Sequence, residues 1–254
     1  MRRGGLEGLS PLIIALDTPD LDAALGMAIA VREHVDIVKV GLELFSVAGP
    51  GAVRALRREG FEVFLDVKLM DIPNTVSSAC LALCPHEPLL VTLHTMGGQE
   101  MMRAAAQAVR ERCESSGERT PLLIGVTVLT SLDVLALKKL GVSNAPEAQV
   151  LRLARLARES GLDGLVTSPL ETLAVRREVG QDMVLVTPGI RPSGAGFDDQ
   201  KRVATPEEAA EAGADFIVVG RPLTRAADPA AAARAILDGV RRVNANFEKG
   251  YQEE

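Results

Sequence analysis

Eight short apolar runs recur along the 254 residues of the chain, and segments with helical periodicity lie between them. The runs span residues 11–17, 36–41, 61–68, 89–94, 122–129, 163–168, 183–189 and 216–221. Strict alternation of strand and helix predicts a parallel sheet, whose strands are apolar throughout because both faces are covered. Eight such units in about 250 residues predict a single-domain α/β protein, a (β/α)8 TIM barrel. An open doubly wound sheet is the alternative, but it usually has fewer strands, and the first turn lacks GxGxxG.

The composition narrows the classes of function. The formal net charge is −6, so nucleic-acid binding is not expected, because it needs clustered cations. Three cysteines without a CxxC pair predict reduced thiols in a cytoplasmic protein, and three histidines make a zinc site improbable. No apolar run approaches the ~20 residues that span a membrane. We expect a frayed N-terminus over residues 1–10, one catalytic barrel over 11–247 and a solvated tail over 248–254.

Charged residues gather at the end of the third apolar run. The segment "FLDVKLMD" carries Asp66, Lys68 and Asp71, and Lys39 lies in the preceding run. In a regular strand, residues i and i+2 point to the same face, so Asp66 and Lys68 are expected side by side, with Lys39 interleaved from the neighbouring strand. Because catalytic groups of this fold come from the carboxyl ends of strands, the set indicates a catalytic charge network. Strand-end salt bridges without chemistry are the alternative.

The loops after the seventh and eighth runs have the features of a phosphate site. In this fold, these loops commonly bind phosphate through backbone N–H groups and a helix N-terminus. Gly220 permits close backbone approach, and Arg221 offers a bidentate guanidinium. Residues 187–206 contain three glycines and form a long connection, which favours a lid over the site. A mobile surface loop is the alternative for this segment.

The motifs together resemble the orotidine 5'-phosphate decarboxylase family in its bacterial form. The segment "DVKLMDIPNT" (66–75) is similar to the DxKxxDIxNT signature of that family. Further segments resemble the family in the expected order: "ALDTPD", "VKVGLELF", "GVTVLTS", "VTPGIRP" with a downstream "DDQKR", and "VVGRPLT". The resemblance implies decarboxylation of orotidine 5'-monophosphate to UMP in pyrimidine biosynthesis, without a cofactor or a metal.

The resemblance also implies roles for individual positions. The implied catalytic charge network consists of Lys39, Asp66, Lys68 and Asp71, in which Lys68 stabilises and protonates a carbanion at C6 of the pyrimidine. The implied substrate-binding residues are Asp17 and Thr75 at the ribose, Thr130 at the pyrimidine, and Arg191, Gln200, Gly220 and Arg221 at the phosphate. Ser131 is the alternative to Thr130 at the pyrimidine.

The same resemblance implies a homodimer, because Asp71 and Thr75 of such enzymes enter the site of the partner subunit. Related barrels that act on sugar phosphates share DxKxxD and typically bind magnesium through an acidic residue where this chain has Lys39. A magnesium-dependent sugar-phosphate enzyme is therefore the nearest alternative, and a non-catalytic nucleotide-binding barrel is another. His94, at the end of the fourth run, is either a base or a structural histidine.

Overall fold

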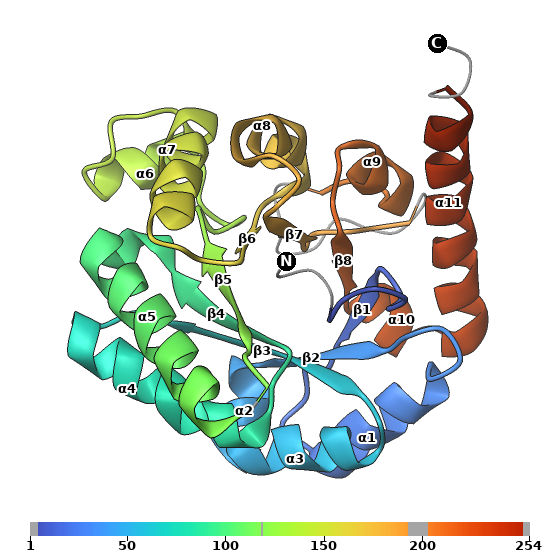
Figure 1. Cartoon of the computed structure of the whole chain (residues 1–254). Helices are drawn as coiled ribbons and strands as arrows, with labels where there is room; N and C mark the ends of the chain where they lie inside the picture. The colour runs from blue at the N-terminus through green and yellow to red at the C-terminus, as the bar shows by residue number, and fades with distance from the viewer. Residues whose placement is uncertain (1–4, 118, 193–202, 251–254) are drawn as a thin grey trace.

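The computed structural model describes residues 5–117, 119–192 and 203–250, with side chains through Val243, and the described strands form a closed parallel barrel. The strands pair in chain order, from β1 to β8 and back to β1. Their bounds are β1 Leu12–Ala15, β2 Ile37–Gly41, β3 Glu62–Leu69, β4 Leu90–His94, β5 Leu122–Val126, β6 Gly164–Val166, β7 Val184–Thr187 and β8 Phe216–Val219. Figure 1 shows the helices arranged around these strands. The predicted (β/α)8 barrel is confirmed.

Helices follow each strand except where the connection from β7 runs into undescribed residues. The α-helices are α1 Leu21–Ala30, α2 Leu42–Ala48, α3 Pro50–Arg58, α4 Pro73–Leu83, α5 Gln99–Ser116, α6 Val134–Lys139, α7 Pro146–Glu159, α8 Pro169–Val179, α9 Pro206–Glu211, α10 Arg221–Thr224 and α11 Pro229–Gly250. Two 3₁₀ turns, η1 Cys84–His86 and η2 Thr95–Gly97, lie before and after β4.

The segment after β2 holds two helices where the periodicity predicted one near residues 50–58. Helix α2 starts directly after β2 and ends at Gly49, whose φ of 55° lies in the left-handed region that glycine tolerates. Pro50 then begins α3, since proline fits the first turn of a helix. The last helix, α11, extends past the predicted end at residue 247.

The described residues form two hydrophobic clusters. The larger cluster lies between the strands and the helices, and the smaller one fills the barrel interior. The interior cluster includes Ile13, Ala15, Ile37, Phe64, Leu90, Ile124, Val184, Val186, Phe216 and Val218. Because strand side chains alternate, the next inward position along β1 to β4 is held by Asp17, Lys39, Asp66 and Thr92. The apolar interior therefore ends in a polar layer at the carboxyl ends of these strands.

Residues 5–10 lie against the amino end of the barrel. Leu6 and Leu9 pack on the interior cluster, and the Ser10 N–H donates to Asp36 Oδ2 over 2.6 Å. The apolar contacts close the end of the barrel that lies away from the polar layer. The domain boundaries predicted at residues 10 and 247 stay predictions.

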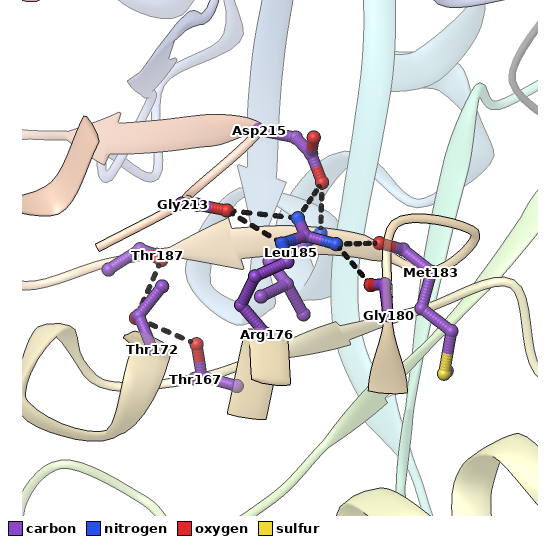
Figure 2. Close-up of polar contacts among 9 residues, drawn as sticks. All are labelled: Thr167, Thr172, Arg176, Gly180, Met183, Leu185, Thr187, Gly213 and Asp215. Carbon is purple, nitrogen blue, oxygen red and sulfur yellow. Dashed lines mark hydrogen bonds and ion pairs between the residues drawn. The ribbon is translucent and has the colours of Figure 1, made fainter. Parts of the chain in front are cut away.

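A buried arginine ties α8 to the amino ends of β7 and β8 (Figure 2). The Arg176 side chain donates to the carbonyl oxygens of Gly180 at 2.7 Å, Met183 at 2.8 Å and Gly213 at 2.9 Å. It also pairs with Asp215 Oδ2 at 2.6 Å, and that oxygen accepts the Leu185 N–H at 2.7 Å. This network joins two αβ connections at the amino end of the barrel.

Candidate active site

A cavity of about 270 Å³ opens at the carboxyl ends of the strands. Eight of the residues predicted for the site line it: Asp17, Lys39, Asp66, Lys68, Thr130, Arg191, Gly220 and Arg221. Asp71 and Thr75 do not line it, and Gln200 lies outside the described residues. Residues from six strands or strand ends thus meet in one space although they are far apart in sequence.

Four charged side chains form a row of alternating sign. Lys39 Nζ lies 3.0 Å from Asp17 Oδ1 and 3.8 Å from Asp66 Oδ2. Lys68 Nζ lies 2.9 Å from each carboxylate oxygen of Asp66. The side chains of Lys39 and Asp66 are only 12% and 13% exposed, so each charge depends on its neighbours to offset its desolvation.

Gly41, at the end of β2, leaves the space that this row needs. A Cβ at Gly41 would approach Lys39 Nζ to 3.0 Å and Asp17 Oδ1 to 3.3 Å. Gly41 is also the residue of β2 that pairs with Asp66 of β3. A side chain at this position would therefore press on the ammonium that joins the two carboxylates.

The Asp66 and Lys68 side chains meet as predicted, but the regular-strand geometry behind that prediction is wrong. Leu65 of β3 pairs with Val91 of β4, and the next pair is Leu69 with Leu93, so two extra residues of β3 bulge between them. Lys68 has a φ of 49°, in the left-handed region that few non-glycine residues adopt. The bulge, rather than strand alternation, turns the lysine toward the aspartate.

Among the described residues that line the cavity, cations outnumber carboxylates. Its lining includes the cations Lys39, Lys68, Arg191 and Arg221, against the carboxylates Asp17 and Asp66. The cavity is therefore locally positive in a chain whose formal net charge is −6. Such a field favours an anionic ligand.

The two arginines lie beside glycines after β7 and β8. Gly189 has a φ of 84°, and the backbone N–H of Arg191 donates to Ala204 O at 2.9 Å. Gly220 precedes Arg221, which begins the short helix α10. Two guanidinium groups that line one cavity suit a phosphate group, which accepts bidentate hydrogen bonds.

The remaining wall of the cavity is largely apolar. Valines from β5 to β8 and the adjoining loops line it: Val126, Val128, Val166, Val186 and Val218. Thr130 belongs to the lining and is partly buried, whereas Ser131 is exposed and does not belong to it. A flat ring with a polar edge fits a wall of this composition.

Asp71 and Thr75 lie on the surface near the start of α4. Both side chains are exposed, and Asp71 Oδ1 accepts the N–H of Ile72 over 2.6 Å. Met70 and Ile72, on either side of Asp71, are 55% and 66% exposed. The single chain does not bring Asp71 or Thr75 to its own cavity, and it presents them together with apolar side chains.

Two residues of β4 interact with the charge row, His94 through the charge of Lys68 and Thr92 through hydrogen bonds, and the sequence singled out only His94. His94 Nδ1 accepts the Met96 N–H over 3.5 Å, and burial followed by the charge of Lys68 lowers the pKa of this histidine. Thr92 was not predicted, although it lies two residues before His94 on the same strand. Its hydroxyl contacts both Asp66 and the backbone of Lys68. The inward spacing from Leu90 was the signal that could have identified it.

Over the described residues, no group of three or more His, Cys, Asp or Glu side chains is arranged to hold a metal ion. In the same part of the chain, no helix combines the length and apolar character needed to cross a lipid bilayer.

Sequence and structure comparisons agree with this architecture. Residues 10–236 match the family model "Orotidine 5'-phosphate decarboxylase / HUMPS family". A relative named orotidine 5'-phosphate decarboxylase from Trichlorobacter lovleyi is 49% identical over 92% of this chain and 96% of its own. One of that name from Anaeromyxobacter sp. (strain K) is 53% identical over 89% of this chain and 96% of its own.

A solved structure gives the same result. The crystal structure of orotidine 5'-phosphate decarboxylase from Lactobacillus acidophilus superposes with a TM-score of 0.80 and 37% identity, over 91% of this chain and 99% of that one. The family model covers most of the chain, and the two relatives are 49% and 53% identical over 92% and 89% of its length. The chain belongs to the orotidine 5'-phosphate decarboxylase / HUMPS family of enzymes.

Proposed function

We propose that the chain decarboxylates orotidine 5'-monophosphate to UMP in pyrimidine biosynthesis, without a cofactor and with Lys68 as the proton donor. One observation carries the proposal: the Lys68 ammonium is held by both oxygens of Asp66 at the mouth of a locally positive cavity. The names of relatives at about half identity over most of the chain support the same reaction.

The chemistry needs a fixed positive charge near C6 of the pyrimidine. The bond from C6 to the carboxylate breaks, its electron pair stays on C6, and CO2 leaves. Lys68 stabilises this carbanion as an ammonium and then gives it a proton, so that the amine left behind is reprotonated from solvent. Two unit charges 4 Å apart interact by about 4 kcal/mol at an effective dielectric of 20. Enzymes lower barriers by roughly 8–23 kcal/mol, so one lysine supplies only a part.

The remainder comes from charges that do not have to reorient during the reaction. Asp66 holds Lys68 in place, and Lys39 lies on the other side of Asp66, so that opposite charges neighbour one another in a partly buried row. The Arg191 and Arg221 side chains bind the phosphate, Asp17 the ribose, and Thr130 the edge of the base. Gln200 completes the phosphate site in this proposal. Binding of the remote phosphate contributes to the rate of the chemical step when it closes the site.

The proposed enzyme is a homodimer with shared sites. Asp71 and Thr75 lie on the surface of the single chain, and the exposed Met70 and Ile72 beside Asp71 supply apolar area for a second copy to cover. In the dimer, Asp71 of one chain enters the cavity of the other and adds a second carboxylate beside Lys68. Thr75 of the same chain contacts the ribose.

Lys39 argues against a magnesium-dependent sugar-phosphate reaction. Its ammonium lies between Asp17 and Asp66, and it occupies the position where an acidic ligand would serve a divalent cation. A cation beside this ammonium would be repelled.

The test is an ultraviolet assay of orotidine 5'-monophosphate consumption with and without EDTA. We expect turnover that EDTA leaves unchanged, and we expect Lys68→Ala to abolish turnover while UMP still binds. Lys139→Ala, which removes an exposed lysine of α6, is the matched control and should keep wild-type turnover. A wild-type chain that does not consume the substrate refutes the function, and wild-type turnover in Lys68→Ala refutes the role of the lysine.

A further inference from the structure

We infer that Thr92 is a positioning residue that sets the geometry of the Lys68–Asp66 pair. The inference rests on the proposed function, because it assigns a task to Thr92 in that reaction. Thr92 lies in β4, facing the interior of the barrel, and is fully buried. It does not line the cavity, so its effect on a bound nucleotide passes through its neighbours.

The Thr92 hydroxyl connects the two members of the pair. Its oxygen accepts the backbone N–H of Lys68 at 2.8 Å. Its own O–H donates to Asp66 Oδ1 at 3.1 Å. One hydroxyl therefore holds the backbone of the lysine and the carboxylate that binds the lysine side chain.

The bulge in β3 creates the need for this contact. Between the Leu65–Val91 and Leu69–Leu93 pairs, the backbone of β3 leaves its regular register with β4. A partly buried N–H that loses its ladder partner costs free energy unless another acceptor replaces it. The Thr92 hydroxyl is that acceptor for Lys68, whose φ of 49° also carries a conformational cost.

The Asp66 end of the contact fixes the orientation of the carboxylate. Asp66 Oδ1 accepts hydrogen bonds from the Thr92 hydroxyl and from Lys68 Nζ. Asp66 Oδ2 accepts a second hydrogen bond from Lys68 Nζ and lies 3.8 Å from Lys39 Nζ. Without the hydroxyl, the carboxylate can rotate toward Lys39, and the Lys68 backbone can relax out of the left-handed region. Both changes move the ammonium, and a misplacement of about 1 Å costs on the order of 100-fold in rate.

The experiment compares Thr92→Val with Thr92→Ser. Valine keeps the branched shape and removes both hydrogen bonds, whereas serine keeps the hydroxyl and loses one methyl group. We expect Thr92→Val to lower kcat by about 10- to 100-fold. The KM for orotidine 5'-monophosphate and the affinity for UMP should change by less than about threefold, because the phosphate contacts are intact. Thr92→Ser should restore kcat to within about fivefold of wild type.

Three kinetic results overturn the inference: a Thr92→Val kcat close to wild type, a loss confined to KM, or a Thr92→Ser enzyme as slow as Thr92→Val. If Thr92→Val does not fold, the comparison of Thr92→Ala with Thr92→Ser decides the question, with thermal unfolding checked for both. A crystal structure of the valine or alanine variant gives a readout that does not depend on turnover. We expect Lys68 to leave its φ of 49° or Nζ to leave Asp66. An unchanged Lys68 overturns the inference, whereas a wild-type chain without activity overturns the proposed function.

Discussion

Replacement of Arg176 by methionine tests whether the amino end of the barrel contributes to stability independently of catalysis at the carboxyl end. The guanidinium binds three backbone carbonyl oxygens and the Asp215 carboxylate at the amino ends of β7 and β8 (Figure 2). Methionine fills much of the same volume but donates nothing. The change therefore leaves three carbonyls without this donor and Asp215 without its cation, while the cavity at the carboxyl ends is not touched.

The expected loss of stability is large. The Arg176 and Asp215 side chains are 8% and 22% exposed, and removing one partner of a buried pair costs about 3–5 kcal/mol. Since proteins are stable by roughly 5–15 kcal/mol, this is a major fraction of the total. One kcal/mol shifts the Tm of a chain of this size by about 2–4 °C, so we expect a fall of roughly 6–20 °C. At temperatures where the variant is folded, kcat should stay near wild type.

The assay is urea unfolding at one protein concentration for Arg176→Met, Asp215→Leu and the double variant. Because the two residues share one contact, the double variant should lose less free energy of unfolding than the sum of the single losses. Arg155→Met is the matched control, since its pair with Glu178 lies on the surface and should leave the midpoint nearly unchanged. Additive losses, or an Arg176→Met midpoint equal to that of the control, refute the reasoning.

Two further predictions concern the site itself. Lys68→Ala and Asp71→Ala chains, each inactive alone, should regain about a quarter of wild-type turnover when they are mixed. Half of the dimers are then mixed, and each mixed dimer holds one intact site. If subunits exchange and no turnover returns, the sites are not shared. In Lys68→Ala, an NMR titration should show that the pKa of His94 rises, because removal of a neighbouring cation makes protonation easier. The pKa of His86, which burial and Arg54 lower, should not change and serves as the internal control. An unmoved His94 pKa contradicts a charged Lys68 beside it.

The sequence predicted the fold because its signals are local. Each apolar run is short, each is followed by a helical pattern, and parallel pairing then leaves few arrangements for eight units. Helix α2 was missed for an equally local reason. It spans only seven residues, directly follows β2, and is separated from α3 by Gly49 alone, so periodicity merges the two helices.

The backbone geometry of the charge row could not be predicted from local sequence signals. Period two brings Asp66 and Lys68 to one face, and the structure also brings them together, but it does so through two inserted residues and a left-handed lysine. Nothing within "FLDVKLMD" specifies that bulge, and the acceptor for the Lys68 N–H within it is a hydroxyl on β4, 24 residues away along the chain. In the sequence alone, Thr92 cannot be distinguished from other strand threonines. The pairing of β3 with β4 is what identifies its contact with Lys68. A residue that acts by supporting the backbone of another strand is therefore identified from register and hydrogen bonds, and the Thr92→Val and Thr92→Ser pair tests that assignment directly.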